Sequence, residues 1–392
     1  MHQEVKLTVK QALRFETVKT AIDGTLTNAE AAAALRLSVR QLQRLKRRVR
    51  AAGPVGVVHG NTGREPPNKT PPEVRDQAIE LATTRYAAYN FSHLADTLAE
   101  DHRIVLSEET LRLWLRPMGH GKAVRRAKAH RRRRKRRAHE GQLLFLDGSP
   151  HPWFGDDHPP VCMLLSSDDA TSKPLWGKFQ PTENRDGCFE VCYRVFTTFG
   201  LPGGFYLDRG SQFTTTRHGG LHVRQGPHTE LTAFEVAMET LGIDLIFARS
   251  PQARGRGERL NGSFQGRLVA ELVDRGIADC RAATRYLNRS FIPRYCRRFG
   301  KPPADPAAAW RPVPEGMDLR AVLAVKHTRT VANDTTVGLN GTTYQLRPPA
   351  HLFHLARAKV EVQERFDGTV RVLHPEHGYL RATPIADPET SS

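Results

Sequence analysis

Long apolar runs are absent from this sequence, and so are the cysteine patterns of secreted and zinc-binding proteins. No stretch approaches the roughly 20 consecutive apolar residues that a membrane-spanning helix requires, and the first residues lack the apolar segment of a signal peptide. The five cysteines form no CxxC pair and no Cys/His spacing of a zinc finger. We therefore expect no membrane partner, a cytoplasmic protein and reduced cysteines that mostly fill the core.

Acidic residues are outnumbered by basic ones. The 392 residues include 41 Asp and Glu against 59 Lys and Arg, which gives a formal net charge of +18 and a pI of about 10.1. Such an excess indicates a polyanionic partner, either nucleic acid or an anionic surface. The length and the 39% of hydrophobic residues allow about two to four domains with apolar cores.

Residues 1–53 have the pattern of a helix-turn-helix domain. A first helix is expected over residues 5–22, with one apolar face made by Val5, Val9, Ala12 and Leu13. A short alanine-rich helix begins after Thr27 or Asn28, and a third helix runs from Ser38 to about residue 50 after a tight turn. Arg and Gln side chains on the third helix suit phosphates and base edges, so the predicted DNA contacts are Arg40, Gln41, Arg44 and Arg47. The alternative is a basic helical hairpin that only packs.

A second helical domain is predicted over residues 71–116, after a Gly- and Pro-containing linker at 54–70. Its helices are expected from Pro72 to about Thr84, from Ser92 to Glu100, and directly after the cap residue Ser107. The order is typical of a winged-helix type of helix-turn-helix. The last helix is less basic than that of the first domain, so DNA contact and packing both stay open.

Residues 117–140 form a basic arm. Eleven Lys and Arg residues lie between Lys122 and Arg137. A block of like charge is typically solvated, and beside DNA-binding domains it would neutralise phosphates and make binding steeply dependent on salt. The arm residues that we expect to contact DNA are Arg131, Arg132, Arg133, Arg134, Lys135, Arg136 and Arg137.

Three acidic residues in the segment 141–300 adjoin short predicted elements. GQLLFLDGSPH places Asp147 at the end of a buried strand, because Gly-Ser-Pro is expected to stop it. GGFYLDRGSQF places Asp208 directly after another strand, and SPQARGRGERLNGSFQ places Glu258 early in a helix. A carboxylate at the end of a buried strand is costly without a partner, and a metal ion is a common one. Between them we expect two further strands in an antiparallel meander, a helix over 183–199, an inserted loop over 214–229, a helix over 230–241 and a fifth strand at IDLIFA.

These three motifs together resemble the DDE transposases of the retroviral-integrase superfamily, most closely bacterial insertion-sequence transposases of the ISNCY type. The resemblance covers most of the chain and implies an α/β core of the RNase H-like fold. It implies that Asp147, Asp208 and Glu258 are the catalytic residues and hold two Mg²⁺ or Mn²⁺ ions, with Asp147 bridging both. Two such ions can activate the attacking oxygen and stabilise the leaving oxygen of a phosphoryl displacement.

The implied function is cleavage at the ends of an insertion element followed by strand transfer into target DNA. The implied partners are double-stranded DNA, both the terminal inverted repeats and the target, and further copies of the chain in a homodimer or larger synaptic complex near the bacterial nucleoid. Two alternatives stay open: an inactive DNA-binding regulator derived from a transposase, and an RNase H-like nuclease without strand transfer. The intact set of three carboxylates argues against the regulator.

Several residues near these motifs have two interpretations each. Asn261 could orient the substrate or lie on an exposed helix surface, and His151 could contact the substrate or close the turn after its strand. We read the other nearby acids as turn-forming or solvated: Asp156, Asp157, Asp168 and Asp169. Positive charge for the DNA phosphates beside the metals would come from Arg254, Arg256 and Arg259.

The last part of the chain reads as a proline-rich linker at 301–325 and a small antiparallel β-barrel at 326–385. Asn340-Gly341 and Asp367-Gly368 are strong signals for hairpin turns. The barrel would contact DNA or a partner, or serve only stability.

Overall fold

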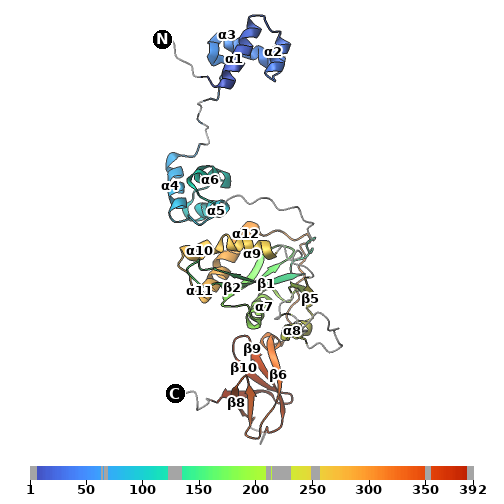
Figure 1. The fold of residues 1–392 in the computed structure, drawn as a ribbon. Helices are drawn as coiled ribbons and strands as arrows, with labels where there is room; N and C mark the ends of the chain where they lie inside the picture. Colours follow the sequence, from blue (N-terminus) through green and yellow to red (C-terminus); the bar gives the residue numbers. More distant parts are fainter. Residues whose placement is uncertain are drawn as a thin grey trace, which may run out of the picture. The chain divides into compact units, whose positions relative to one another are not determined.

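The computed structural model describes residues 7–62, 65, 69–121, 135–208, 213, 231–248, 257–348 and 355–385 (Figure 1). The chain divides into two compact units, Met1–Asp76 and Gln77–Ser392. Of the helices in the described ranges, none has the length and apolar character needed to cross a membrane.

The first unit contains the three predicted helices, α1 (Val9–Ile22), α2 (Asn28–Ala34) and α3 (Val39–Ala52). Thr8, Thr27 and Ser38 cap them, and in each case the Gln or Glu three residues later bonds back to the cap backbone. These reciprocal caps satisfy backbone N–H groups that the first turn leaves unpaired. The tight turn between α2 and α3 contains Arg36 in the left-handed region, with φ of +52°. The predicted order and caps of α2 and α3 are confirmed.

The core of the first unit lies around α3, and it corrects two predictions. Val9 and Leu13 are 79% and 65% exposed, so the apolar face predicted for the first helix is wrong. The buried residues of α1 are Val18 and Ala21, because only its second half packs within this core. The linker predicted from residue 54 begins later, since Gly53–Val57 forms a 3-10 turn whose Val57 is buried in the same core.

Three more helices follow, α4 (Pro72–Thr83), α5 (Phe91–His102) and α6 (Glu108–Leu115). They occur where the sequence predicts them. Ser107 caps α6 as expected, whereas α5 begins earlier than predicted because Asn90, not Ser92, accepts the hydrogen bond from the backbone N–H of His93 at 2.9 Å. Asparagine is among the best capping residues, and here Asn90 caps the helix instead of Ser92.

A five-stranded mixed sheet forms the centre of the second unit. Its strand order is β3-β2-β1-β4-β5; β1, β2 and β3 pair antiparallel, and β4 and β5 run parallel to β1. The predicted meander of three strands is therefore confirmed. The strands are β1 (Leu144–His151), β2 (Val161–Asp168), β3 (Pro174–Gln180), β4 (Gly204–Leu207) and β5 (Asp244–Phe247).

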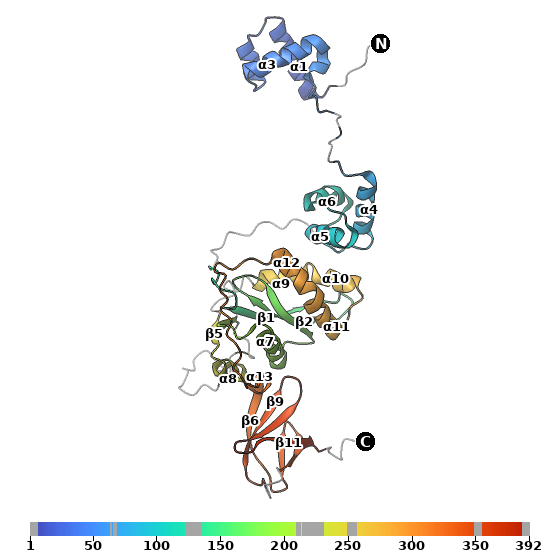
Figure 2. The ribbon, with the colours of Figure 1, turned by 180° about the vertical axis from the view of Figure 1, so that it is seen from behind.

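Helices cover both faces of this sheet. Leu144 and Leu146 of β1 pack with α7 and α8 in one apolar cluster, whereas Met163 and Leu165 of β2 pack with α9 to α12 in another. Figure 2 shows α7 on one side of β1 and β2, with α9 and α12 on the other. The helices are α7 (Arg185–Phe199), α8 (Ala233–Thr240), α9 (Gly257–Gln265), α10 (Leu268–Asp274), α11 (Cys280–Tyr286), a π-helical turn (Leu287–Phe291) and α12 (Ile292–Phe299).

The first strand does not stop at Asp147, which corrects the prediction from Gly-Ser-Pro. β1 stays paired with β2 as far as His151, through Pro150. On its other side, β1 pairs with β4 only at Leu144 and Phe145. The second half of β1 is therefore an edge, where a proline that lacks an N–H is tolerated.

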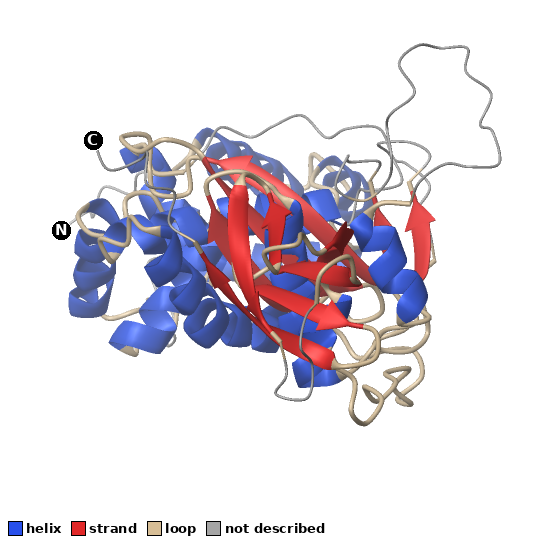
Figure 3. Ribbon diagram, turned by 90° about the horizontal axis from the view of Figure 1, so that it is seen from below, coloured by secondary structure: helices blue, strands red, loops and turns tan. Residues whose placement is uncertain are grey.

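The C-terminal part is a six-stranded antiparallel sheet of order β6-β9-β10-β11-β8-β7. The edge strands approach each other, since Arg329 Nε of β6 donates to the carbonyl of Gly338 in β7 at 3.3 Å, so the sheet nearly closes (Figure 3). The predicted Asn340-Gly341 turn has both residues at positive φ, +50° and +82°. The strands are β6 (Ala324–Thr330), β7 (Thr336–Leu339), β8 (Thr342–Arg347), β9 (Lys359–Arg365), β10 (Val370–His374) and β11 (Gly378–Pro384).

The segment 301–325 packs against the core, so its interpretation as a linker is wrong. The ring of Trp310 lies 2.5 Å from where a Cβ on Gly141 would be. Arg311 pairs with the backbone of Leu201 and donates from Nη2 to the carbonyl of Gly242 at 2.7 Å. A short helix, α13 (Leu319–Val322), follows and joins the same apolar cluster. Proline content predicts a free chain, but Trp310 and Val313 are partly buried against the apolar cluster of the core.

Candidate active site

Asp147 lies on β1, on the face of the sheet that α9 covers. Its strand partner is Leu165, which belongs to the apolar cluster of α9 to α12, and directly opposed residues share a face. Asn261 Nδ2 donates to Asp147 Oδ2 at 2.9 Å. A Cβ on Gly257, the first residue of α9, would lie 3.4 Å from the same oxygen. The first turns of α9 therefore rest on the Asp147 carboxylate.

Asn261 is 9% exposed, so the alternative that places it on an exposed helix surface is wrong. Its amide holds one oxygen of Asp147 in a fixed direction. Gln265, one turn further along α9, donates to Ser149 Oγ at 3.2 Å and ties the helix to the same strand.

Asp208 directly follows β4, as the sequence predicts, and is half-buried. Leu144 pairs with Phe205 and Phe145 with Tyr206 in the parallel ladder. Asp147 and Asp208 each lie two residues past the last pair of this ladder, Phe145 with Tyr206. The two aspartates therefore follow the paired parts of adjacent parallel strands at the same end.

Glu258 is the second residue of α9, and its side chain is exposed. Within the described ranges, no three His, Cys, Asp or Glu side chains are grouped so that they could hold a metal ion. The structure thus places Asp147 and Asp208 just past the paired parts of adjacent strands, and it places Glu258, whose side chain is exposed, next to Gly257.

Glu183 is a further carboxylate next to β1, on the α7 side of the strand, and the sequence reasoning missed it. It lies in the loop between β3 and α7, and a Cβ on Gly148 would come within 2.1 Å of its Oε2. Burial raises the pKa of the Cys162 thiol to about 12, and the charges of Glu183 and then of Asp147 add to that rise. A glycine inside a strand often marks a close approach, so Gly148 was the available signal.

Replacing Gly148 by alanine is expected to displace the Glu183 carboxylate, because the new methyl group would collide with it. Since that carboxylate is the end of a flexible side chain, the free energy of unfolding should fall by only about 1 kcal/mol. Scanning calorimetry would measure the loss. The matched control is Gly338→Ala, another strand glycine, where an added Cβ meets nothing within 4 Å. An equal loss in both variants would contradict the close contact between Gly148 and Glu183.

His151 ends β1 and is half-buried against Trp153, with the two rings edge to face and their centroids 5.3 Å apart. Trp153 and Phe154 are buried and pack in the cluster of α9 to α12. The same His151 lines a cleft together with Asn90, Arg112 and Gln265. Its contact with substrate stays a prediction.

The competing acids have the structural roles that we expected. Asp156 and Asp157 are exposed. Asp168 is buried and accepts hydrogen bonds from the backbone of Gly141 and of Thr171, so it shapes the turn after β2. Burial raises its pKa. All five cysteines are free thiols, and Cys162, Cys188 and Cys192 are buried core residues as predicted.

The predicted DNA contacts on α3 share an exposed face opposite the buried Leu42 and Leu45. The side-chain oxygen Oε1 of Gln41 accepts a hydrogen bond from the backbone N–H of Ser38. The side-chain nitrogen Nε2 of Gln41 is therefore the atom that we expect to contact DNA. All four predicted contacts are exposed: Arg40, Gln41, Arg44 and Arg47.

The other predicted contacts divide into three groups. Arg131 to Arg134, Arg254 and Arg256 lie outside the described residues, as does the predicted loop over 214–229. Lys135, Arg137 and Arg259 are exposed. The guanidinium of Arg136 donates to the carbonyl of Ala170 at 3.0 Å, so that side chain is held on the core and is a weaker candidate for phosphate contact.

This chain is similar in sequence to a helix-turn-helix family and to two transposases. A family described as a helix-turn-helix domain matches residues 14–65. The candidate transposase y4bF of Sinorhizobium fredii is 32% identical over 377 residues, which cover 95% of this chain and 80% of that relative. This chain belongs to the transposase family. The transposase for insertion sequence IS1202 of Streptococcus pneumoniae is 25% identical over 398 residues, covering 92% of this chain and 84% of the relative.

Among solved structures, this transposase is partly similar to viral integrases. The catalytic core domain of HTLV-2 integrase in complex with magnesium is 13% identical, with a TM-score of 0.29 over 38% of this chain and 84% of that one. The intasome of simian T-cell lymphotropic virus in complex with the PP2A regulatory subunit B56 gamma is 13% identical, with a TM-score of 0.34 over 79% and 99%.

Proposed function

We propose that this transposase cleaves DNA at the ends of an insertion element and joins the freed end to target DNA, in a metal-dependent reaction of the DDE type. The observation that carries the proposal is that Asp147 and Asp208 each follow the last pair of the parallel β1–β4 ladder by two residues, with α9 resting on Asp147. The strand order supports an RNase H-like core, and the nearly closed C-terminal sheet supports a small barrel.

The donor atoms at this edge suit Mg²⁺ or Mn²⁺, because they are carboxylate oxygens. Asp147 on β1 and Asp208 after β4 would hold two ions. Glu258 would add a third carboxylate ligand when its exposed side chain turns towards them. Bound ions would activate the attacking oxygen and stabilise the leaving oxygen. The chain itself orients Asp147 through the Asn261 amide and offers Arg259 to a nearby phosphate.

Double-stranded DNA is the proposed partner, read at element ends by the first unit and held by the basic arm. A reaction that joins two element ends to one target needs two active sites, so we propose a homodimer or larger assembly. The transposase relatives favour this function over the regulator and the nuclease.

Incubating the purified chain with DNA that carries candidate terminal repeats and Mg²⁺ or Mn²⁺ tests the proposal. We expect nicks at the element ends and joined products with a target plasmid. Nicks without joined products would support a nuclease, and binding without nicks would support the regulator.

Replacing Arg44 by alanine is expected to weaken binding to element ends. Loss of one phosphate contact should reduce the slope of log affinity against log salt by about 0.9, whereas loss of a base contact should cost about 1–3 kcal/mol at one sequence position. Titrations at several salt concentrations with matched and scrambled ends separate the two cases. Lys19→Ala, an exposed cation on α1, is the control, and equal losses in both would contradict DNA reading by α3.

A further inference from the structure

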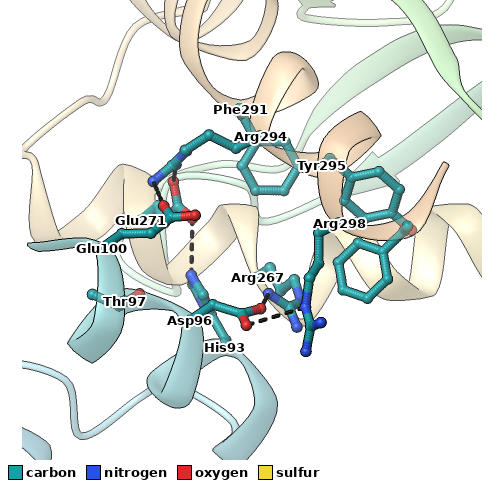
Figure 4. Close-up of a pocket in the computed structure, with 11 residues that line it drawn as sticks. His93, Asp96, Thr97, Glu100, Arg267, Glu271, Phe291, Arg294, Tyr295 and Arg298 are labelled. Carbon is teal, nitrogen blue, oxygen red and sulfur yellow. Dashed lines mark hydrogen bonds and ion pairs between the residues drawn. The ribbon is translucent and has the colours of Figure 1, made fainter. Parts of the chain in front are cut away.

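A buried group of charged side chains joins α5 to the helices that follow α9. We call it the Glu271 cluster (Figure 4). α5 contributes a histidine and an aspartate, and the segment from the end of α9 to α12 contributes the other members. Its members are His93, Asp96, Arg267, Glu271 and Arg294.

Glu271 of α10 is the centre of the cluster and is 5% exposed. His93 Nε2 donates to its Oε1 at 2.8 Å, and Tyr286 and Arg294 donate to its other oxygen. Burial by itself would raise the pKa of Glu271, but the hydrogen bonds from His93 and Tyr286 outweigh burial and hold that pKa below its usual value. Burial lowers the pKa of His93. The carboxylate is therefore charged and the imidazole neutral, which keeps this contact satisfied near neutral pH.

The second contact lies at the C-terminal end of α9. Arg267, which is 8% exposed, donates to Asp96 Oδ2 at 2.9 Å and to Ser92 Oγ at 2.8 Å. Asn90 Nδ2 donates to the carbonyl of Gly266 at 2.9 Å. Gly266 and Arg267 directly follow Gln265, the last residue of α9. α5 and its cap residue thus bind the two residues that directly follow α9.

The other end of α9 rests on the candidate active site. Gly257 and Asn261 both lie against Asp147, and Glu258 stands between them in the sequence. A helix of nine residues is only about 13 Å long and behaves as a stiff rod. Since Phe264 of α9 is fully buried, a shift at Gly266 moves the whole helix through a close-packed core.

We infer that Asn90 and Arg267 are positioning residues for the active site, acting through α9. α5 and its cap residue then set the place of Glu258 and Asn261 relative to Asp147, a role that differs from packing alone and from DNA contact. This inference rests on the proposed function. It also bears on the alternatives for the second helical domain: the cluster commits one face of α5 to the catalytic core, while DNA contact by α6 stays a prediction.

Two variants test the inference, and a third is the control. Asn90→Ser keeps a good cap for α5 but cannot reach Gly266. Arg267→Met removes both hydrogen bonds while it keeps the side-chain length. Arg298→Met removes a 60% exposed arginine that also pairs with Asp96, at 3.2 Å, but extends from α12 and does not touch α9.

We expect Asn90→Ser and Arg267→Met to slow end cleavage by about tenfold to a hundredfold, the cost of misplacing reacting groups by about 1 Å. Binding to element ends should stay unchanged, and amide hydrogen exchange over 257–265 should accelerate. Arg298→Met should match the unsubstituted chain in all three measurements.

Cleavage at the unsubstituted rate in both variants, with unchanged exchange in α9, would overturn the inference and leave the proposed function standing. An equal slowing in Arg298→Met would also overturn it, because general weakening of the interface would then be the cause. If the unsubstituted chain itself does not cut element ends, the proposed function fails, and this inference fails with it.

Discussion

Asp147→Asn is expected to abolish cleavage and strand transfer while binding to element ends persists. Asparagine keeps the size of the side chain and can still accept the hydrogen bond from Asn261, but it removes the negative charge from the edge where β1 meets β4. If the transition state loses about 4 kcal/mol of metal-assisted stabilisation, the rate of cleavage falls about a thousandfold.

The companion variants Asp208→Asn and Glu258→Gln should fail in the same way, since each would remove an oxygen donor that carries charge. Cleavage of labelled end DNA in Mg²⁺ and in Mn²⁺, followed on a denaturing gel, is the measurement. Asp157→Asn, at an exposed acid on the loop after β1, is the control and should cut normally. Persistent cleavage in the three variants would show that the site is elsewhere.

Glu271→Ala is expected to lower the free energy of unfolding of the second unit by about 3–5 kcal/mol, because it removes one partner of a buried ion pair. Arg294 would keep its charge in a largely buried place, and the hydrogen bonds of His93 and Tyr286 would have no acceptor. Scanning calorimetry can follow the second unit apart from the first, since the two are separate compact units.

The control for this prediction is Glu100→Ala. Glu100 lies 3.8 Å from Arg294 but is 51% exposed, so its removal should cost no more than about 1 kcal/mol. Equal transitions for the two variants would contradict the central role of Glu271.

Lowering the pH should reduce the contribution of the Glu271 cluster to the free energy of unfolding. His93 has a pKa below its ordinary value of 6.5 in the folded state, so the unfolded chain takes up a proton first, and stability falls as the pH drops below that value. Glu271 has a folded pKa below 4.5, so its contribution is complete above that value and is lost as the pH falls through the folded pKa. Glu271→Ala should therefore lose the part of the acid dependence that the carboxylate supplies.

The sequence by itself determined the features that depend on neighbours a few residues apart. Thr27 and Ser38 start α2 and α3 because each has its capping partner three residues later. Asn340-Gly341 makes its hairpin turn because both residues adopt positive φ at little cost. The position of Asp208 after β4 follows from the short apolar run at residues 205–207 that precedes it in the sequence.

Only the tertiary structure decided the contacts between residues distant in the chain. β1 continues past Asp147 because β2 pairs with it to the end, and a proline there costs little once β4 has stopped pairing. Asn261 reaches Asp147 across 114 positions, and His93 reaches Glu271 across 178. Caps, turns and apolar periodicity act over one or two helical turns, so they carry no information about which distant side chain will fill a given space. The sequence therefore predicted which acids could form the active site, and the packing of α9 on β1 determined how they are held.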